Sequence, residues 1–462
     1  NRGNHSFESK INCKNLFMRK LNDVYSRSGN VKWGNLMSLV CICIINLSAI
    51  DGMAQQKPWS LRVCIEHARE HNLQVEYARV SLENTSVDLS REKAQRLPSL
   101  DFSSTQGWGH QKSSSYTGSY SLNGNMALYQ GGKLSRSIQQ QELVEKAMTQ
   151  DVLVAQNDIE IAVTKAYLQI LYANETLKTD RQTLESSGEQ LARSKALLDA
   201  GSISTSDFAQ MESQYSNDQY RVIQSENDLA FSKLQLKQLL ELGLEDDFDV
   251  VFPELDERNV LVAIPGLDEV YREALRVMPE MKSSRLNVES AILGEKIAKG
   301  DYLPSISLTA SVSTNHDSKS SGSYFSQMDD RLNENVGINI SIPITNRKKA
   351  RLNVSKARLQ TEQSRLAERN TRKDLLQTVE SLHQDVVAAQ SRYSAANQRV
   401  KSAYTSYRQV QEEFDAGMKN PVDLLVEKNN YLSALQEQIQ AKYQAVLAFK
   451  LLNFYRNESI DI

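Results

Sequence analysis

Three side chains in the first quarter of the chain have a spacing that could bind a metal ion. Cys64, His67 and His71 stand at positions i, i+3 and i+7, which share one face of an α-helix. A thiolate and two imidazoles are ligands that Zn²⁺ accepts. A second copy of this segment, described below, has neither cysteine nor histidine at these positions, which favours ordinary helix side chains. We expect no metal and no other cofactor.

A second motif, Gly131-Gly132-Lys133, has only part of a phosphate-binding loop. Such a loop needs a glycine at the position of Ala127 and a serine or threonine at that of Leu134. The six histidines are scattered, and no set of nucleophile, base and orienting residue stands out. We therefore expect the protein not to be an enzyme.

The composition is that of a moderately polar protein. It is 40% hydrophobic and 24% charged, with a net charge of −3. This balance favours neither nucleic acid nor an anionic membrane surface as a partner, so we expect no nucleic-acid binding.

The beginning of the sequence has the features of a targeting segment. Arg27 and Lys32 precede an apolar run from Leu36 to Ile50, and Gly52-Met53-Ala54 supplies the small residues of a signal-peptidase site. An uncleaved membrane anchor is the alternative, although the run is shorter than the roughly 20 residues that a spanning helix needs. With cleavage after Ala54, only Cys64 of the four cysteines remains, which excludes a disulfide within the mature chain.

The elements that must position any site are two long helical hairpins. Residues 347–455 form a helical pattern broken once, at 415–421. The arm before the break keeps a four-three apolar spacing from Leu375 to Phe414, which is a coiled-coil seam. After the break, apolar residues recur at every seventh position from Leu425 to Val446. Residues 347–455 therefore predict two antiparallel helices joined at a turn.

An earlier stretch repeats this hairpin. Apolar residues recur at sevens through residues 163–198, before a turn at 199–205 and a return arm. Both turns begin Asp-Ala-Gly, and an aspartate, Asp207 or Asp423, follows six residues after the glycine. Arms of this length would be roughly 50 to 100 Å long at 1.5 Å per residue, far longer than a small domain is wide. They cannot be core elements of a compact globule.

The duplication extends to the segments before each hairpin. Residues 267–298 align with 61–92 at a shift of 206, and both copies continue into Leu-Pro-Ser. Apolar and small or polar residues then alternate in four strands of about ten residues, around 100–108, 116–128, 306–313 and 336–342. We expect exposed loops between the strands of each pair, at Gly109–Ser115 and Asn315–Asn333.

Strands of this kind suit the wall of a membrane barrel. The alternative is a soluble β-sandwich edge. Because barrels of a single chain need at least eight strands, four strands in a membrane would require several copies of the chain to share one barrel. We divide the chain into residues 1–54 (signal peptide and upstream extension), 55–240 (first structural repeat), 241–265 (linker), 266–455 (second structural repeat) and 456–462 (C-terminal tail).

The doubled order of helices, strand, loop, strand and hairpin resembles that of the TolC-like outer-membrane efflux protein family. The resemblance covers roughly residues 59–455. The residues that carry it are Ser60-Leu61 with Ala68 and Asn72, Leu97-Pro98-Ser99, Leu128-Tyr129-Gln130-Gly131-Gly132, Ile342-Pro343-Ile344 and the two turns, 201–207 and 417–423. The second copy departs from the first at Thr345-Asn346-Arg347, which affects only the local turn.

The resemblance implies a mostly α fold with a β-barrel part. Three copies would share a 12-stranded barrel in outer-membrane lipid, continued by a periplasmic α-helical barrel. The homotrimer would be a passive exit duct in the outer membrane of a Gram-negative-type bacterium. It would open when a periplasmic adaptor protein, coupled to an inner-membrane pump, docks on the tips. Substrate and pump class stay open.

The same resemblance assigns roles to residues of the two turns. Gly201, Ser202, Gly417 and Met418 fall at the positions that dock onto the adaptor. Asp423 falls on a position where carboxylates ring the closed pore, and Lys419 on a basic position that ties neighbouring hairpins. The second aspartate of that ring would stand at Val426, and whether Glu427 replaces it is open.

Two alternatives remain from the residues themselves. Asp423 follows Pro421 at a helix start, where the helix dipole favours any carboxylate, so a helix-start role competes with a gate. The alternative for the whole chain is a periplasmic coiled-coil scaffold or adaptor protein, which would normally have one hairpin flanked by β-rich domains rather than two equivalent hairpins.

Overall fold

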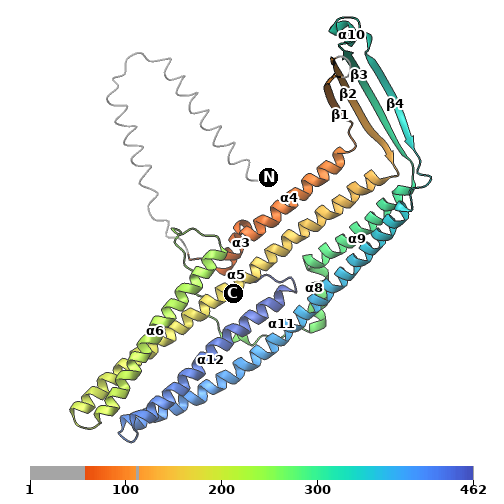
Figure 1. Ribbon diagram of the computed structural model, residues 1–462. Coiled ribbons are helices and arrows are strands. Elements are labelled where there is room, and N and C mark those ends of the chain that lie inside the picture. Colours follow the sequence, from red (N-terminus) through yellow and green to blue (C-terminus); the bar gives the residue numbers. More distant parts are fainter. Residues whose placement is uncertain (1–57, 111–113, 461–462) are drawn as a thin grey trace, which may run out of the picture. The chain divides into compact units, whose positions relative to one another are not determined.

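A computed structural model describes residues 58–110 and 114–460. From Pro58 onward the chain forms one compact unit, and the predicted signal peptide lies outside the described residues. Figure 1 shows a small sheet at one end of this unit and the turns of two long helical hairpins at the other. None of the described helices combines the length and apolar character that a bilayer-spanning helix requires.

The predicted order of elements occurs twice. The first copy consists of α3 (Leu61–His71), α4 (Leu73–Ala94), β1 (Ser99–His110), β2 (Ser114–Gln130), α5 (Lys133–Asp199) and α6 (Thr205–Leu239). The second consists of α8 (Leu267–Val277), α9 (Pro279–Lys299), the 3₁₀ turn η1 (Gly300–Tyr302), β3 (Ser305–Asp317), α10 (Tyr324–Asp330), β4 (Asn333–Ser341), α11 (Lys349–Asp415) and α12 (Pro421–Phe454). The short helix α7 (Glu257–Val260) lies between the copies.

Local sequence explains where the paired short and long helices divide. Asn72 ends α3, and its side chain accepts a hydrogen bond from the backbone of Gln74 at the start of α4. In the second copy Pro279 is the first residue of α9, a position where its missing N–H is not needed. Both copies therefore bend at the same place by different means.

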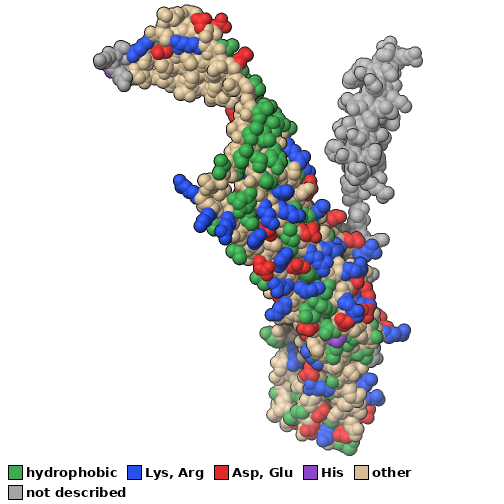
Figure 2. Space-filling view, turned by 90° about the vertical axis from the view of Figure 1, so that its right-hand side faces the viewer, with side chains coloured by type: hydrophobic (Ala, Val, Ile, Leu, Met, Phe, Trp, Pro, Cys, Tyr) green, Lys and Arg blue, Asp and Glu red, His purple; other side chains and the backbone are tan. Residues whose placement is uncertain are grey.

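The four strands form one antiparallel sheet in the order β1-β2-β3-β4. The register places Leu122 opposite both Phe102 and Val312, and Leu308 opposite Ile338, so the apolar residues of all four strands share one face. Few hydrophobic side chains lie on the face of the sheet turned to the viewer in Figure 2. β2, with 17 residues, is longer than the ten or so predicted.

The predicted exposed loop at Asn315–Asn333 is wrong in part. β3 continues to Asp317, and the segment then contains α10, whose Gln327 is buried together with His316. The Gln327 side chain accepts a hydrogen bond from the backbone N–H of Asp317 and donates to the carbonyls of Ser320 and Gly322. One buried amide thus orders a serine-rich stretch that composition alone assigns to a loop.

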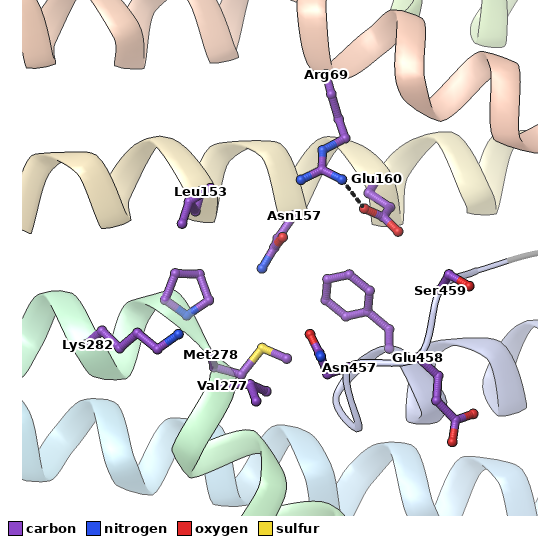
Figure 3. Close-up of a pocket in the computed structure, with 12 residues that line it drawn as sticks. Arg69, Leu153, Asn157, Glu160, Val277, Met278, Lys282, Asn457, Glu458 and Ser459 are labelled. Carbon is purple, nitrogen blue, oxygen red and sulfur yellow. Dashed lines mark ion pairs between the residues drawn. The ribbon is translucent and has the colours of Figure 1, made fainter.

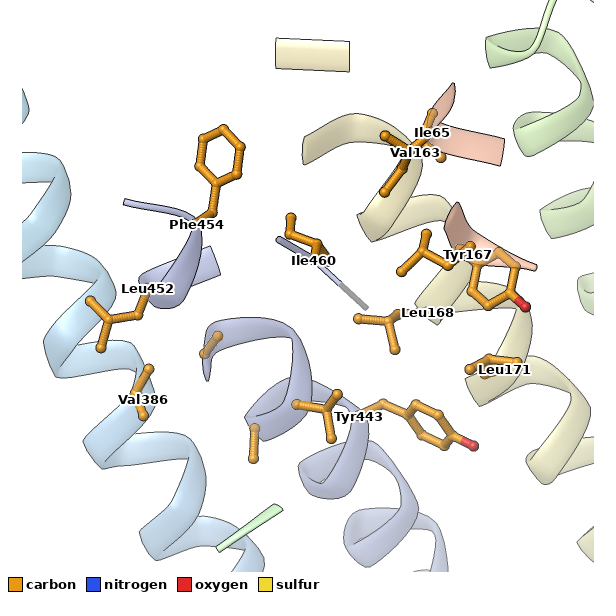
Figure 4. Close-up of a cluster of buried hydrophobic side chains, with 14 of the residues drawn as sticks. Ile65, Val163, Tyr167, Leu168, Leu171, Val386, Tyr443, Leu452, Phe454 and Ile460 are labelled. Atoms are coloured by element: carbon orange, nitrogen blue, oxygen red, sulfur yellow. The ribbon is translucent and has the colours of Figure 1, made fainter. Parts of the chain in front are cut away.

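The largest apolar core lies midway along the helices, where α3, α5, α8, α11 and α12 meet. Figure 4 shows Tyr167 and Leu168 of α5 in the same cluster as Tyr443 and Leu452 of α12. The linker contributes too, because Val250 and Val260 are buried and the Tyr167 hydroxyl donates to the Val251 carbonyl at 2.6 Å. The linker therefore fastens the middle of the helices rather than only connecting the copies.

Candidate functional site at the hairpin tips

Both hairpin turns lie at the same end of the unit, far from the sheet (Figure 1). An ion pair between Arg193 of α5 and Asp415 of α11, at 2.9 Å, joins the two tips. Between them lies a groove of about 580 Å³. Its lining comes from both turns and includes Ser202, Asp207, Gly417, Met418, Lys419 and Asp423.

The first tip, the turn between α5 and α6, is closed by its own side chains. Gly201 adopts φ +68°, and the backbone N–H of Ser202 donates to the Leu197 carbonyl, which ends α5. Ser204 then caps α6. Its hydroxyl donates to the Asp207 carboxylate at 2.8 Å and accepts from the Asp207 backbone N–H at 3.1 Å. The Asp207 carboxylate is thus used within the cap.

The second tip, the turn between α11 and α12, has the same backbone with different chemistry. Gly417 adopts φ +73°, and Asn420 caps α12 by accepting from the Asp423 backbone N–H at 2.9 Å. The amide of Asn420 leaves the Asp423 carboxylate out of the cap. That carboxylate lies 3.9 Å from Lys419 Nζ, and both side chains are nearly half exposed.

The structure thus brings all six predicted site residues to one end of the unit. Gly201, Ser202, Gly417 and Met418 are exposed, and the Met418 side chain is 71% exposed. Lys419 and Asp423 form a loose ion pair. Glu427, one turn further along α12, accepts a hydrogen bond from Ser406 of α11 at 2.8 Å.

Sequence reasoning missed a buried polar cluster behind the tips. Lys428 of α12 lies 3.3 Å from the Asp218 carboxylate of α6 and donates to Ser187 of α5 at 2.5 Å, and the Lys428 and Asp218 side chains are only 3% and 1% exposed. Ser187 also donates to Asp218. The sequence contains a signal for this cluster, because Lys428 stands three residues after Leu425 and four before Leu432. A lysine therefore occupies a position of the apolar seam, where burial is expected.

Burial sets the electrostatics of this cluster. It lowers the pKa of the Lys428 ammonium, and the nearby Asp218 charge opposes that shift. In the first hairpin, further from its tip, burial raises the pKa of Asp180, although a hydrogen bond from Ser225 favours its charged form. Charged groups in a seam are costly unless paired, so the second hairpin completes the interior of the first.

A further pair joins the hairpins nearer the middle of the unit. Lys442 of α12 lies 3.0 Å from the Glu175 carboxylate of α5, and the Tyr443 hydroxyl donates to the same carboxylate at 2.6 Å. Burial and the Glu175 charge raise the pKa of Tyr443. Polar contacts at Asp415, Lys428 and Lys442 therefore lie along the boundary between the hairpins.

A separate pocket of about 420 Å³ lies where α12 ends and α9 begins (Figure 3). Its wall carries the ion pair of Arg69 with Glu160, at 3.5 Å. Burial raises the pKa of the Glu160 carboxyl, and Arg69 opposes the shift. Neither histidine nor cysteine is among the described residues that line this pocket, and none of the predicted site residues lies in it.

The residues with metal-ligand spacing are used in other ways. Cys64 is fully buried, and burial raises the pKa of its thiol to about 12. The His67 ring stacks on His71 at 4.3 Å, and its Nε2 lies 3.1 Å from the Leu240 carbonyl. Within residues 58–110 and 114–460, no group of three or more His, Cys, Asp or Glu side chains could hold a metal ion.

Known proteins share this fold and sequence pattern. The chain is 23% identical over 346 residues to an uncharacterized protein of Haemophilus influenzae, a match that covers 72% of this chain and 71% of that one. Among solved structures, its fold is similar to those of CusC (TM-score 0.72, 16% identity, 87% of this chain and 95% of that one) and of the CmeC outer membrane channel of Campylobacter jejuni (TM-score 0.70, 18% identity, 88% and 92%).

The similarity extends to VceC, an outer membrane protein of Vibrio cholerae (TM-score 0.70, 15% identity, 85% of this chain and 95% of that one). The family model of outer membrane efflux proteins matches residues 64–241 and 270–455, which takes in nearly all of both copies. The chain therefore belongs to the outer membrane efflux protein family, and it is an efflux protein of the outer membrane.

Proposed function

We propose that three copies of this chain form a passive exit duct that a periplasmic adaptor, coupled to an inner-membrane pump, opens at the hairpin tips. The observation that carries the proposal is the sheet. Of the described strands, β1 and β4 each have one neighbour, and one face of the sheet is apolar. Unpaired strand edges in lipid cost several kcal/mol per backbone group, so β4 of one copy must pair with β1 of the next. Three such sheets make 12 strands.

The internal repeat supports a matching contact between the helices of neighbouring copies. Within one copy α9 packs between α5 and α11, whereas its counterpart α4 packs on α5 alone among the long helices. The free side of α4 carries an exposed seam at four-three spacing, with Leu73, Tyr77, Val80 and Val87 each at least 50% exposed. By the symmetry of the repeat, this seam would pack on α11 of the next copy.

The free side of α11 has the matching residues. Leu352, Leu359 and Leu366 recur at sevens and are 63%, 68% and 51% exposed. Exposed leucines at heptad spacing on a helix of 67 residues are an association surface. The α4 seam and the α11 leucines together would close the wall of the helical barrel.

The tips supply the docking surface and the gate of the proposed duct. The groove between them is lined by polar and charged residues and by Met418, an exposed apolar side chain that a helical partner can cover. Around a three-fold axis the Asp423 carboxylates would converge in a narrow opening, where like charges attract cations and repel anions. Docking that spreads the tips would widen this opening.

The proposal is tested in planar bilayers with the protein purified from outer membranes in mild detergent. We expect an oligomer mass of three chains and a channel that prefers cations. Asp423→Asn should lower the cation-to-anion permeability ratio by about two-fold or more, since it removes one charge per copy at the constriction.

Asp207→Asn is the matched control, because Asp207 occupies the equivalent place in the first tip and is held in the cap. The control should leave the permeability ratio unchanged. A monomer without conductance would contradict the duct, whereas a trimeric channel that both variants affect equally would contradict only the gate at Asp423.

A further inference from the structure

The short helix α10 lies on the apolar face of the sheet. Thr314 and His316 of β3 belong to the same face as Val312, since side chains alternate along a strand. The Thr314 hydroxyl donates to the Met328 carbonyl of α10 at 2.6 Å, and the Tyr324 ring packs against His316 at 4.8 Å. On this face of β3 the apolar residues run from Ile306 to Val312 and form a hydrophobic band. α10 therefore covers the apolar face of the sheet just beyond Val312.

The seat for α10 is built into two strands. His316 is only 7% exposed and lies between the rings of Tyr116 and Tyr324, at 5.2 and 4.8 Å. Gly118 of β2 makes room for the imidazole, because a Cβ there would lie 2.3 Å from its Cε1. The Tyr324 hydroxyl also donates to that of Tyr120 at 3.0 Å. These contacts fix α10 against the outside of the sheet rather than over its polar face.

α10 exposes two aromatic rings, although the ring of Tyr324 also packs on the sheet. Phe325 is 80% exposed and Tyr324 is 41% exposed. Trp108 and Tyr116, which pair across β1 and β2 on the same face, are 71% and 45% exposed. A cluster of exposed aromatic rings at one end of an apolar band is typical of the girdle that a membrane barrel places at the lipid headgroups.

The length of the band agrees with this position. Thr314 follows Ile306, near the other end of β3, by eight residues. At about 3.3 Å per residue these residues span roughly 26 Å along the strand, which is roughly 20 Å along the membrane normal because barrel strands are tilted by about 35–45°. An apolar band of a membrane barrel is about 25 Å tall, so α10 stands at the outer edge of such a band, where the hydrocarbon meets the headgroups.

We propose that α10 is a membrane-interface anchor. Phe325 and Tyr324 insert among the headgroups and upper acyl chains of the outer leaflet, and this holds the β3–β4 connection beside the barrel and away from its mouth. The inference rests on the proposed barrel, in which the apolar face of the sheet contacts lipid. A neighbouring copy of the chain is the other surface that these rings could meet.

The test measures the depth of position 325 in the trimer. In a chain whose four cysteines are replaced by alanine, Phe325→Cys is labelled with an environment-sensitive fluorophore and reconstituted into vesicles of phospholipid and lipopolysaccharide. Asp330→Cys, exposed on the same helix but about 140° round its axis from position 325, is the matched control, and Ile338→Cys marks the apolar band, where Ile338 is 64% exposed. Quenching is compared between nitroxide phospholipids and a water-soluble quencher.

We expect the lipid quencher to act on Phe325→Cys several-fold more strongly than on Asp330→Cys, and about as strongly as on Ile338→Cys. If position 338 is quenched by lipid but 325 behaves like 330, the anchor is wrong and the barrel stands. If neither 338 nor 325 senses lipid, the proposed barrel itself fails. Cross-linking of position 325 to a neighbouring copy, without lipid quenching, would also overturn the anchor.

Discussion

The two hairpin tips have the same backbone and use equivalent carboxylates differently. In both, a glycine with positive φ ends the incoming helix, and an aspartate follows six residues later. In the first tip the hydroxyl of Ser204 draws Asp207 into a capping box. In the second, Asn420 caps the helix alone and Asp423 is left beside Lys419. The identity of the cap residue thus decides whether the aspartate at this repeated position is held in the helix cap, as Asp207 is, or left outside it, as Asp423 is.

The hairpins also differ in what they bury, and removing the buried cation Lys428 tests this difference. Lys428→Ala would leave the Asp218 carboxylate buried without its cation, and breaking a buried ion pair in this way costs about 3–5 kcal/mol. We expect amide hydrogen exchange in both hairpins to become much faster near the tips. Mass spectrometry of peptic fragments would measure it.

A double variant separates lost pairing from lost packing. Asp218→Asn with Lys428→Met removes both charges and keeps similar volumes, so most of the protection should return. Arg181→Ala, which breaks an exposed pair with Glu226 at 2.7 Å, is a control with little expected effect. If Lys428→Ala changed the second hairpin only, the two hairpins would not share this interior.

The glycines of the two tips provide the next effect, and here the tips should behave alike. A Cβ at Gly201 or Gly417 would meet nothing within 4 Å, so alanine at either position adds only the strain of a positive φ. That strain is about 1–2 kcal/mol. Gly201→Ala and Gly417→Ala should therefore raise hydrogen exchange in their own turns to the same extent. Unequal effects would show that the matching backbones are not energetically equivalent.

Most of the fold could be predicted from the sequence because the relevant signals are periodic. The four-three seam of the second hairpin and the alternation in β3 are repeated patterns that tolerate a few exceptions. The duplication adds a second test of each element. The tip residues were found only through the family resemblance, since a glycine turn at a helix end has many uses.

What could not be predicted depends on single side chains. Lys428 and Asp218 each occupy a seam position, and the pattern alone does not show that these two residues, 210 positions apart, face one another across the two hairpins. α10 likewise depends on Gln327, whose amide orders a segment of polar composition. Such specific contacts between distant residues have no periodic signature.

Exchanging the cap residues tests the difference between the two tips more directly. Ser204→Ala should cost about 1 kcal/mol in the first turn of α6, and Asn420→Ala a similar amount in α12, as typical helix caps do. Asn420→Ser should instead keep the cap and engage Asp423 as Ser204 engages Asp207. We then expect bilayer recordings to show weaker cation preference without loss of stability. An unchanged cation preference would mean that engaging the Asp423 carboxylate in the cap does not alter its effect on passing ions.

The buried Asp180 in the interior of the first hairpin should make the stability of this hairpin depend weakly on pH. Burial raises the pKa of Asp180 above its ordinary value of 3.8, so the folded chain holds this proton more tightly than the unfolded chain. Its contribution to stability is present below pH 3.8 and is lost as the pH rises through the raised pKa. Asp180→Asn should flatten this part of the stability profile, measured by hydrogen exchange in α5 and α6 from pH 4 upward. Asp88→Asn on the surface of α4 should leave the profile unchanged, and an equal flattening by both variants would place the dependence elsewhere.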